Sequence, residues 1–451
     1  MQIETGLFNS MVIQRDKNDL SDQLITGKGS GDIIVKVSHK GKSLSGFSKY
    51  KLGRAVKGKF NIKLKGLPVG GPYKIELKDD KDTLIVKDVL IGDVWILAGQ
   101  SNMEGIGNLE NRLKGRNKVR AFYMTNEWGV AEDPIHIPHQ AKAWVHNAGN
   151  PSYRPKGAKG VGPGVAFGQA MLKTENIPQG LIACAHCGTE MTAWDPSKIN
   201  MGDKSFYGAM INRFIENGSK IKGVLWYQGC SDANSKDARV YTMRMKQLIA
   251  SMRNDFNDKR LPVVVVQIGR RTKVDPDING WNSIRDQQYR LPHEINRIVT
   301  VPVIDLPLDD HIHLSAAGQH ILGERLSEAM TSLLHGRKAA MPPIEIQKIS
   351  LKKHPISPPH TIDIVVHYKN IIGKLESKGR ASGFTLAVNN IDYLTVFDIK
   401  LDGNKVIINC DCDKAELLMY DLYYGFGMNP YCNITDSDGR SLPAFGPVTL
   451  R

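Results

Sequence analysis

Short apolar runs that recur through the middle of the chain constrain its fold most strongly. Val94–Ala98 contains no polar residue and ends at Gly99, as in a strand that is buried on both faces. Amphipathic helical patterns separate this run from later ones, and strands that alternate with helices predict a parallel sheet covered by helices on both sides. The functional site of such a sheet lies at the carboxyl ends of its strands. The later apolar runs occupy residues 181–184, 223–227, 262–268 and 298–304.

The two ends of the chain show strand patterns instead. Apolar residues alternate with polar ones in residues 60–65 and again in residues 73–77, which is typical of an antiparallel sheet with one face in water. After residue 338 strand patterns return, with a hairpin signal at Asp402-Gly403. We therefore expect an α/β chain in which a three-layer αβα catalytic domain (91–338) lies between an N-terminal β-sandwich (1–90) and a C-terminal β-sandwich (339–451).

Composition excludes several classes of protein. The 451 residues are 41% hydrophobic, as in ordinary globular proteins, and no apolar run approaches the ~18 residues that span a bilayer. The net charge is +14, but the basic residues are spread out and do not alternate with aromatics, which disfavours nucleic-acid binding. The first residues lack a signal-peptide pattern, although a chain cloned after its signal peptide would look the same. Six cysteines are too few for a disulfide scaffold.

Two strand ends in the first half of the middle region carry candidate chemistry. Ser101 follows a buried strand and Gly99, which places its hydroxyl at the lip of the sheet; the alternative is that it caps a helix. Gly188 follows the run at 181–184, and glycine lets a backbone N–H approach a ligand closely. The alternative for Gly188 is a plain turn between a strand and a helix.

Two later segments complete a catalytic set. Gln228 ends the run at 223–227, where its amide could face a developing negative charge or satisfy nearby backbone. Asp310 precedes His313 by three residues, so its carboxylate could orient the imidazole, although a lone histidine there is more often structural. Ser315 or a neighbour is expected to cap a helix that begins near Ala316. Together these residues supply a nucleophile, two oxyanion donors, and a base with its orienting acid.

At this point the sequence resembles the SGNH hydrolases, and within them the sialate O-acetylesterase branch. The most specific block is Gly99-Gln100-Ser101-Asn102-Met103, and the similarity continues through Asp310-x-x-His313. Residues 7–15 and 424–445 also resemble the ends of bacterial sialate esterases. Further matching segments are Gly92-Asp93-Val94-Trp95, Gly188-Thr189 with Trp194, Trp226-Tyr227-Gln228-Gly229, Arg285-x-x-Gln288 and Gly323-x-Arg325-Leu326.

The resemblance implies a role for each matched residue. Ser101 is the nucleophile and His313 the general base, with Asp310 as its partner, while His311 points elsewhere. The backbone N–H groups of Ser101 and Gly188 and the side chain of Gln228 form the oxyanion hole. The substrate-binding residues are Gln100, Asn102, Trp194 and Arg285.

Two cysteines depart from the family pattern. Cys187 stands where the family usually has a second glycine, and Cys230 where it usually has a glutamate. Either the two form a disulfide beside the oxyanion hole, or they are independent buried thiols. Trp128, Trp144 and Tyr153, in the long segment from 126 to 164, are expected to offer flat faces to a sugar ring.

The resemblance implies removal of O-acetyl groups from carbohydrates, on sialic acids or on xylan or another polysaccharide, through an acetyl-serine intermediate. It requires no metal or other cofactor and no nucleic-acid or membrane partner, and it favours a periplasmic or secreted protein. A hypothesis of another class is a non-catalytic glycan-binding protein. A lipase is disfavoured, since no apolar lid helix is evident in the sequence.

Overall fold

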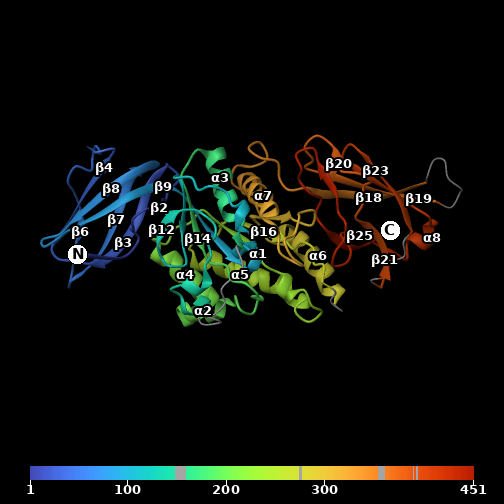
Figure 1. The fold of residues 1–451 in the computed structure, drawn as a ribbon, viewed down its shortest axis with the longest axis horizontal. Helices are drawn as coiled ribbons and strands as arrows, with labels where there is room; N and C mark the ends of the chain where they lie inside the picture. The colour runs from blue at the N-terminus through green and yellow to red at the C-terminus, as the bar shows by residue number, and fades with distance from the viewer. Residues whose placement is uncertain (148–158, 274–276, 354–360, 390, 393–394, 451) are drawn as a thin grey trace. The chain divides into compact units, whose positions relative to one another are not determined.

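The computed structural model describes every residue except 148–158, 274–276, 354–360, 390, 393–394 and 451. The chain divides into two compact units, which are described separately. Unit 1 contains Met1–Leu225 and Gln247–Leu261, and unit 2 contains Trp226–Lys246 and Pro262–Arg451. Figure 1 follows the order of the elements by colour, from the blue N-terminal strands to the red C-terminal strands.

The N-terminal part of unit 1 consists of antiparallel strands, as the alternating pattern predicts. Strand β7 (Lys59–Pro68) pairs with β3 (Leu20–Lys28), and β8 (Gly70–Lys78) pairs with β4 (Asp32–His39). The apolar positions of β7 are buried and the lysines between them are exposed. The remaining strands of this part are β1 (Gln2–Thr5), β2 (Val12–Gln14), β5 (Lys42–Ser43) and β6 (Tyr50–Arg54).

A single long strand, β9 (Thr83–Gly99), connects these N-terminal strands to the candidate site. Its first half pairs antiparallel with β8, and its second half pairs parallel with β14 (Gln179–Ala183). The apolar run that ends at Ala98 forms the buried second half. The expected boundary between residues 90 and 91 therefore falls inside a continuous strand.

The sheet of unit 1 is mixed, which corrects the prediction of an all-parallel sheet. Strand β11 (Val119–Phe122) pairs parallel with β14, but β12 (Trp128–Val130) pairs antiparallel with β11. The chain reverses between these two strands because Asn126 adopts a left-handed conformation (φ 61°) and Tyr123 and Glu127 share a backbone hydrogen bond. The helices of unit 1 include α3 (Gly164–Glu175), which packs on β14, and α4 (Phe206–Glu216).

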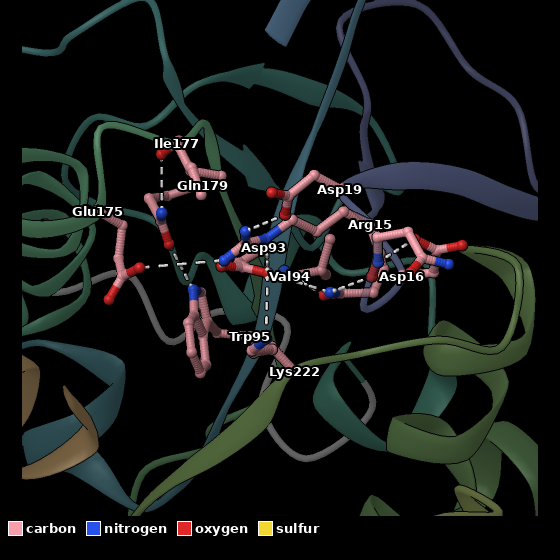
Figure 2. Close-up of polar contacts among 12 residues, drawn as sticks. Arg15, Asp16, Asp19, Asp93, Val94, Trp95, Glu175, Ile177, Gln179 and Lys222 are labelled. Carbon is pink, nitrogen blue, oxygen red and sulfur yellow. Dashed lines mark hydrogen bonds and ion pairs between the residues drawn. The ribbon is translucent and has the colours of Figure 1, made fainter. Parts of the chain in front are cut away.

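A buried carboxylate ties the N-terminal segment to β9 (Figure 2). Asp93 is 1% exposed, and its two oxygens accept hydrogen bonds from the Arg15 guanidinium at 2.9 and 2.7 Å. Gln14 donates to the same carboxylate and accepts the Val94 N–H at 2.7 Å. The charge of Asp93 is thus balanced inside the protein, which a buried carboxylate requires. Removing one partner would leave the other ion buried and uncompensated.

Unit 2 contains parallel strands followed by an all-β segment. Strands β16 (Val263–Gln267) and β17 (Ile298–Pro302) are parallel, and α6 (Ile278–Glu294) connects them. Helix α7 (Ala316–His335) begins where the sequence predicts, with Ser315 as its N-cap. Strand β15 (Gly223–Tyr227) and helix α5 (Tyr241–Asp255) each have residues in both units.

The C-terminal strands of unit 2 form two four-stranded antiparallel sheets and one antiparallel pair, β20 (Leu375–Ser377) with β26 (Ile434–Asp436), and they share one core. The predicted hairpin is confirmed, because β23 and β24 pair antiparallel and Asp402 is paired with Lys405 next to the turn. The first sheet contains β18 (Glu345–Lys353), β19 (Ile362–Lys369), β24 (Lys405–Cys410) and β23 (Val396–Asp402), and the second contains β22 (Ile391–Asp392), β21 (Phe384–Val388), β25 (Asp421–Tyr424) and β27 (Phe445–Thr449).

Within the described part of the chain, none of the helices has the length and apolar character needed to cross a membrane.

Candidate active site

Ser101 lies directly after the buried half of β9. The strand ends at Gly99, whose φ of 127° suits glycine and lets the backbone turn sharply. One helical turn follows, α1 (Ser101–Glu104), and its N-cap is Gln100. Ser101 is therefore the first residue of the helix, and the alternative interpretation, in which it serves as the cap, is wrong.

The loop after β14 lies beside the start of α1. The parallel pairing of β14 with β9 continues past the strand ends, because His186 donates its backbone N–H to the Gly99 carbonyl at 3.0 Å. Gly188 has φ +71°, and nothing lies within 4 Å of the position that a Cβ atom would occupy there. Ser101 and Gly188 are thus presented at the same edge of the sheet, as two of the predicted oxyanion donors require.

The side chain of Glu104 in α1 accepts a hydrogen bond from this loop. The Cys187 N–H donates to Glu104 Oε2 at 2.5 Å. Burial raises the pKa of the Glu104 carboxyl to about 8, although the hydrogen bond from Cys187 lowers it in part. Glu104 is therefore mostly protonated at neutral pH. The sequence analysis assigned no role to Glu104. The only feature that could have indicated one was its position one helical turn after Ser101.

The other end of the loop is held by a buried tryptophan. Trp194 Nε1 donates to Thr189 Oγ1 at 2.9 Å, and that hydroxyl donates to the His186 carbonyl at 2.9 Å. The Trp194 ring is completely buried and packs on Phe206, with ring centroids 5.5 Å apart. These contacts indicate that Trp194 supports the loop, and its predicted contact with substrate stays a prediction. The predicted contacts of Gln100 and Asn102, both buried, stay predictions as well.

A cavity opens in unit 1 next to α1. Its volume is about 580 Å³, which is within the range of small-molecule sites. Most of its wall comes from the long segment 126–164, where the sequence analysis expected contacts with a sugar ring, and the rest comes from α1 and the residues after it. The residues that line it include Glu104, Ile106, His136, Ile137, His139 and Lys159.

Gln228 is fixed in unit 2 by contacts on both its backbone and its side chain. Its carbonyl accepts hydrogen bonds from Gln288 Nε2 at 2.8 Å and from the Tyr241 hydroxyl at 3.1 Å. Gly229 makes this possible, since a Cβ there would lie 2.7 Å from Gln288 Nε2. The Gln228 amide nitrogen donates to the carboxylate of Asp232, which is completely buried.

The bond to Asp232 determines the orientation of the Gln228 amide. A carboxylate accepts from the NH₂ end and not from the carbonyl end, and an NH₂ group has two hydrogens. The bond to Asp232 occupies one of them and fixes the direction of the other. Asp232, Gln288 and Tyr241 are supporting residues that the sequence analysis missed, because their contacts join segments far apart along the chain.

His313 and Asp310 are in contact, as their spacing predicts. His313 Nδ1 lies 2.8 Å from Asp310 Oδ2, and Asp310 Oδ1 accepts the backbone N–H groups of Ile312 and His313. Burial raises the pKa of Asp310, but the bonds from His313 and from the two backbone groups outweigh it, so the pKa lies well below its usual value. An ionised Asp310 keeps the ring proton on Nδ1 and leaves Nε2 as the basic atom.

Arg285 is held inside unit 2 by backbone carbonyls, and its predicted contact with substrate stays a prediction. It is 1% exposed, and its guanidinium donates to the backbone carbonyls of Gly269, Gly425, Gly427 and Met428. These bonds tie α6 to the C-terminal strands within unit 2. Burial lowers its pKa to about 9.

The structure bears on one of the three predicted aromatic faces and on the two alternatives for the cysteines. Trp128 is buried against Phe122 and donates to Asn217 Oδ1 at 2.8 Å, so it is a packing residue and offers no face to a sugar. Trp144 is 55% exposed on α2 (Trp144–Asn147), and Tyr153 lies outside the described residues. Cys187 and Cys230 are thiols and not a disulfide. Burial raises the pKa of Cys230 to about 12, which keeps this thiol protonated.

The described contacts therefore assemble two groups of residues, each within its own unit. In unit 1 they bring Glu104 of α1 to the loop that carries Gly188. In unit 2 they join His313 to Asp310 and Gln228 to Asp232. The first group can present a hydroxyl and backbone N–H donors, and the second a base and an amide donor.

Comparison with known proteins agrees with this chemistry. The family model "Carbohydrate esterase, sialic acid-specific acetylesterase" matches residues 91–332, more than half of the chain. A probable carbohydrate esterase of Arabidopsis thaliana is 30% identical over 53% of this chain and 90% of its own length. Human sialate O-acetylesterase is 24% identical over 62% of this chain and 59% of its own length.

Comparison with solved structures finds a carbohydrate acetylesterase with a similar fold. The crystal structure of a carbohydrate acetylesterase from Xanthomonas citri has a TM-score of 0.72 and 21% identity, with 98% of each chain covered. That likeness concerns the fold alone. The match to the family model, together with the predicted nucleophile block inside it, shows that this chain belongs to the sialic acid-specific acetylesterase family of carbohydrate esterases.

Proposed function

We propose that this esterase removes O-acetyl groups from carbohydrates through an acetyl-serine intermediate on Ser101. The observation that carries the proposal is the bond between His313 Nδ1 and the ionised Asp310 carboxylate, which prepares His313 Nε2 to accept a proton. A serine hydroxyl becomes a nucleophile when an oriented base removes its proton in this way. The family match supports the same assignment.

The reaction would proceed in two halves. Ser101 Oγ attacks the ester carbonyl as His313 takes its proton, and the carbonyl oxygen becomes an oxyanion. The N–H groups of Ser101 and Gly188 and the Gln228 amide stabilise that charge. The bond to the sugar oxygen then breaks, and His313 returns the proton to the sugar. Water, activated by His313, hydrolyses the acetyl-serine and releases acetate.

The proposal extends to the substrate, the domains and the location. The cavity beside α1 would receive part of the sugar, and its His139 and Lys159 would favour a sugar that carries a carboxylate. Sialic acids fit this description, and acetylated xylan is the second candidate. We further propose that, along the chain, a three-layer region follows an N-terminal β-sandwich with which it shares β9 and precedes a C-terminal β-sandwich (339–451), and that the protein acts outside the cytoplasm.

The test is a screen of purified protein against acetylated sialic acids, acetylxylan and acetylated pectin, with freed acetate as the readout. We expect release from at least one substrate and its loss in Ser101→Ala. Hydrolysis that survives this change would remove Ser101 as the nucleophile. Binding of the glycan without any acetate release, in both proteins, would instead support a non-catalytic glycan-binding protein.

A further inference from the structure

One buried hydrogen bond connects the helix of the nucleophile to the loop of a proposed oxyanion donor. Helix α1 carries Ser101 as its first residue and Glu104 as its last. Glu104 is 4% exposed, and its Oε2 accepts the Cys187 N–H at 2.5 Å. Cys187 is the residue immediately before Gly188, so the contact acts one peptide away from the proposed donor.

The contact restrains the peptide that precedes the one carrying the Gly188 N–H. The Gly188 N–H belongs to the peptide that begins at the Cys187 carbonyl, so its direction depends on the dihedral angles of Cys187. The His186 N–H is bonded to the Gly99 carbonyl at 3.0 Å, and Glu104 holds the following N–H. Gly188 itself has φ +71°, and nothing lies within 4 Å of the position that a Cβ atom would occupy there, so no side chain packs against it on that side.

We propose that Glu104 is a positioning residue that holds the loop at 187–188 so that the Gly188 N–H faces the oxyanion. The proposal rests on the function proposed above. One partner departs from the family pattern described above: Cys187 stands in place of a second glycine, and the bond uses its backbone. A side chain at position 187 restricts the loop, and Glu104 selects one arrangement of it.

The protonation state of Glu104 suits this role. A carboxylate close to the developing oxyanion would repel it, whereas a neutral carboxyl group can accept the Cys187 N–H without adding a negative charge. Burial raises the pKa of Glu104 to about 8, so the neutral form prevails at pH 7. A glutamine has the same shape and also offers an uncharged carbonyl oxygen as an acceptor.

The test compares Glu104→Gln with Glu104→Leu by steady-state kinetics on an acetyl ester and by hydrogen exchange of residues 186–189. We expect Glu104→Gln to keep kcat within about threefold. Glu104→Leu should lower kcat by about tenfold to a hundredfold with little change in KM, because complete loss of one oxyanion donor costs about 10²- to 10³-fold. Exchange at Cys187 should become faster in the leucine variant.

A matched control is Glu216→Leu, which removes a partly buried carboxyl group of unit 1 that is bonded to Asn126 and, like Glu104, has a raised pKa. It should leave kcat unchanged. Wild-type kcat in Glu104→Leu, or a change confined to KM, would overturn the positioning role. A tenfold or larger loss in Glu104→Gln would also overturn it, and this arm remains informative if the leucine variant does not fold.

The outcomes separate the two proposals. If the wild-type protein hydrolyses no acetyl ester, the proposed function fails, whatever the exchange rates show. If the wild-type protein is active and Ser101→Ala is not, the function stands, and the Glu104 variants alone decide the positioning role.

Discussion

The carboxylate of Asp310 holds both the ring and the backbone of His313. One oxygen lies 2.8 Å from His313 Nδ1, and the other accepts the His313 N–H at 2.8 Å. Asp310 therefore fixes His313 through both its ring and its backbone N–H. The contact at Nδ1 also sets the tautomer of the imidazole. The proposed base is positioned before substrate binds.

The first prediction concerns this pair. Asp310→Asn should lower turnover by about 10³- to 10⁴-fold, since an amide can present a donor to Nδ1 and so favour the wrong tautomer. Acetate release at saturating substrate measures the effect. The control is His311→Ala, a neighbouring histidine outside the proposed machinery, which should retain wild-type turnover. Similar losses in both variants would indicate a general disturbance of the turn.

A second prediction concerns Gln228, the proposed side-chain donor of the oxyanion hole. Gln228→Ala should lower kcat by about 10²- to 10³-fold with less effect on KM, because the oxyanion exists only in the transition state. Asp232→Asn should produce a smaller loss of the same kind, since it weakens the bond that orients the amide. Unchanged turnover in Gln228→Ala would remove Gln228 from the hole.

The third prediction follows from the raised pKa of Glu104. The folded protein keeps the proton until about pH 8, whereas the unfolded chain loses it near 4.5. Wild-type stability should therefore fall relative to Glu104→Gln as pH rises from about 4.5 to 8, by up to about 1.4 kcal/mol per pH unit. Above pH 8 the difference should stay constant. Urea unfolding of both proteins between pH 4 and 9 measures it, and parallel curves would contradict the shift.

The fourth prediction separates a structural from a substrate-binding role for Arg285. Arg285→Met should lower the free energy of unfolding by about 3 kcal/mol or more, because several buried carbonyls lose a charged donor. KM should stay close to wild type in the protein that remains folded. A raised KM with unchanged stability would instead support the predicted substrate contact.

Much of the fold could be predicted because it depends on local patterns. The alternation at residues 60–65 and the uniform apolar run before Gly99 each identify a strand and its environment. The contact between Asp310 and His313 was also predictable, since a spacing of three residues on one turn brings the side chains together. The mixed sheet was not, because the reversal at residues 123–127 follows the conformation of Asn126.

The supporting contacts of the site required the structure. Glu104 and Cys187 are 83 positions apart, so nothing in the sequence near either residue shows their bond. Trp128 looks like any aromatic of a long loop, and only its packing on Phe122 shows that it is buried. Arg285 matches a family motif, but the motif does not reveal that its donors face backbone carbonyls.

The continuity of β9 has a consequence for how the chain can be divided. Its first half pairs with strand β8 of the N-terminal sheet, and its second half ends two residues before the proposed nucleophile. A protein shortened to begin at residue 91 would lose the pairing of β9 with β8, and Asp93 would lose Arg15 as its counter-ion. The N-terminal strands therefore support the strand that positions the proposed nucleophile, and they do not form a separable domain.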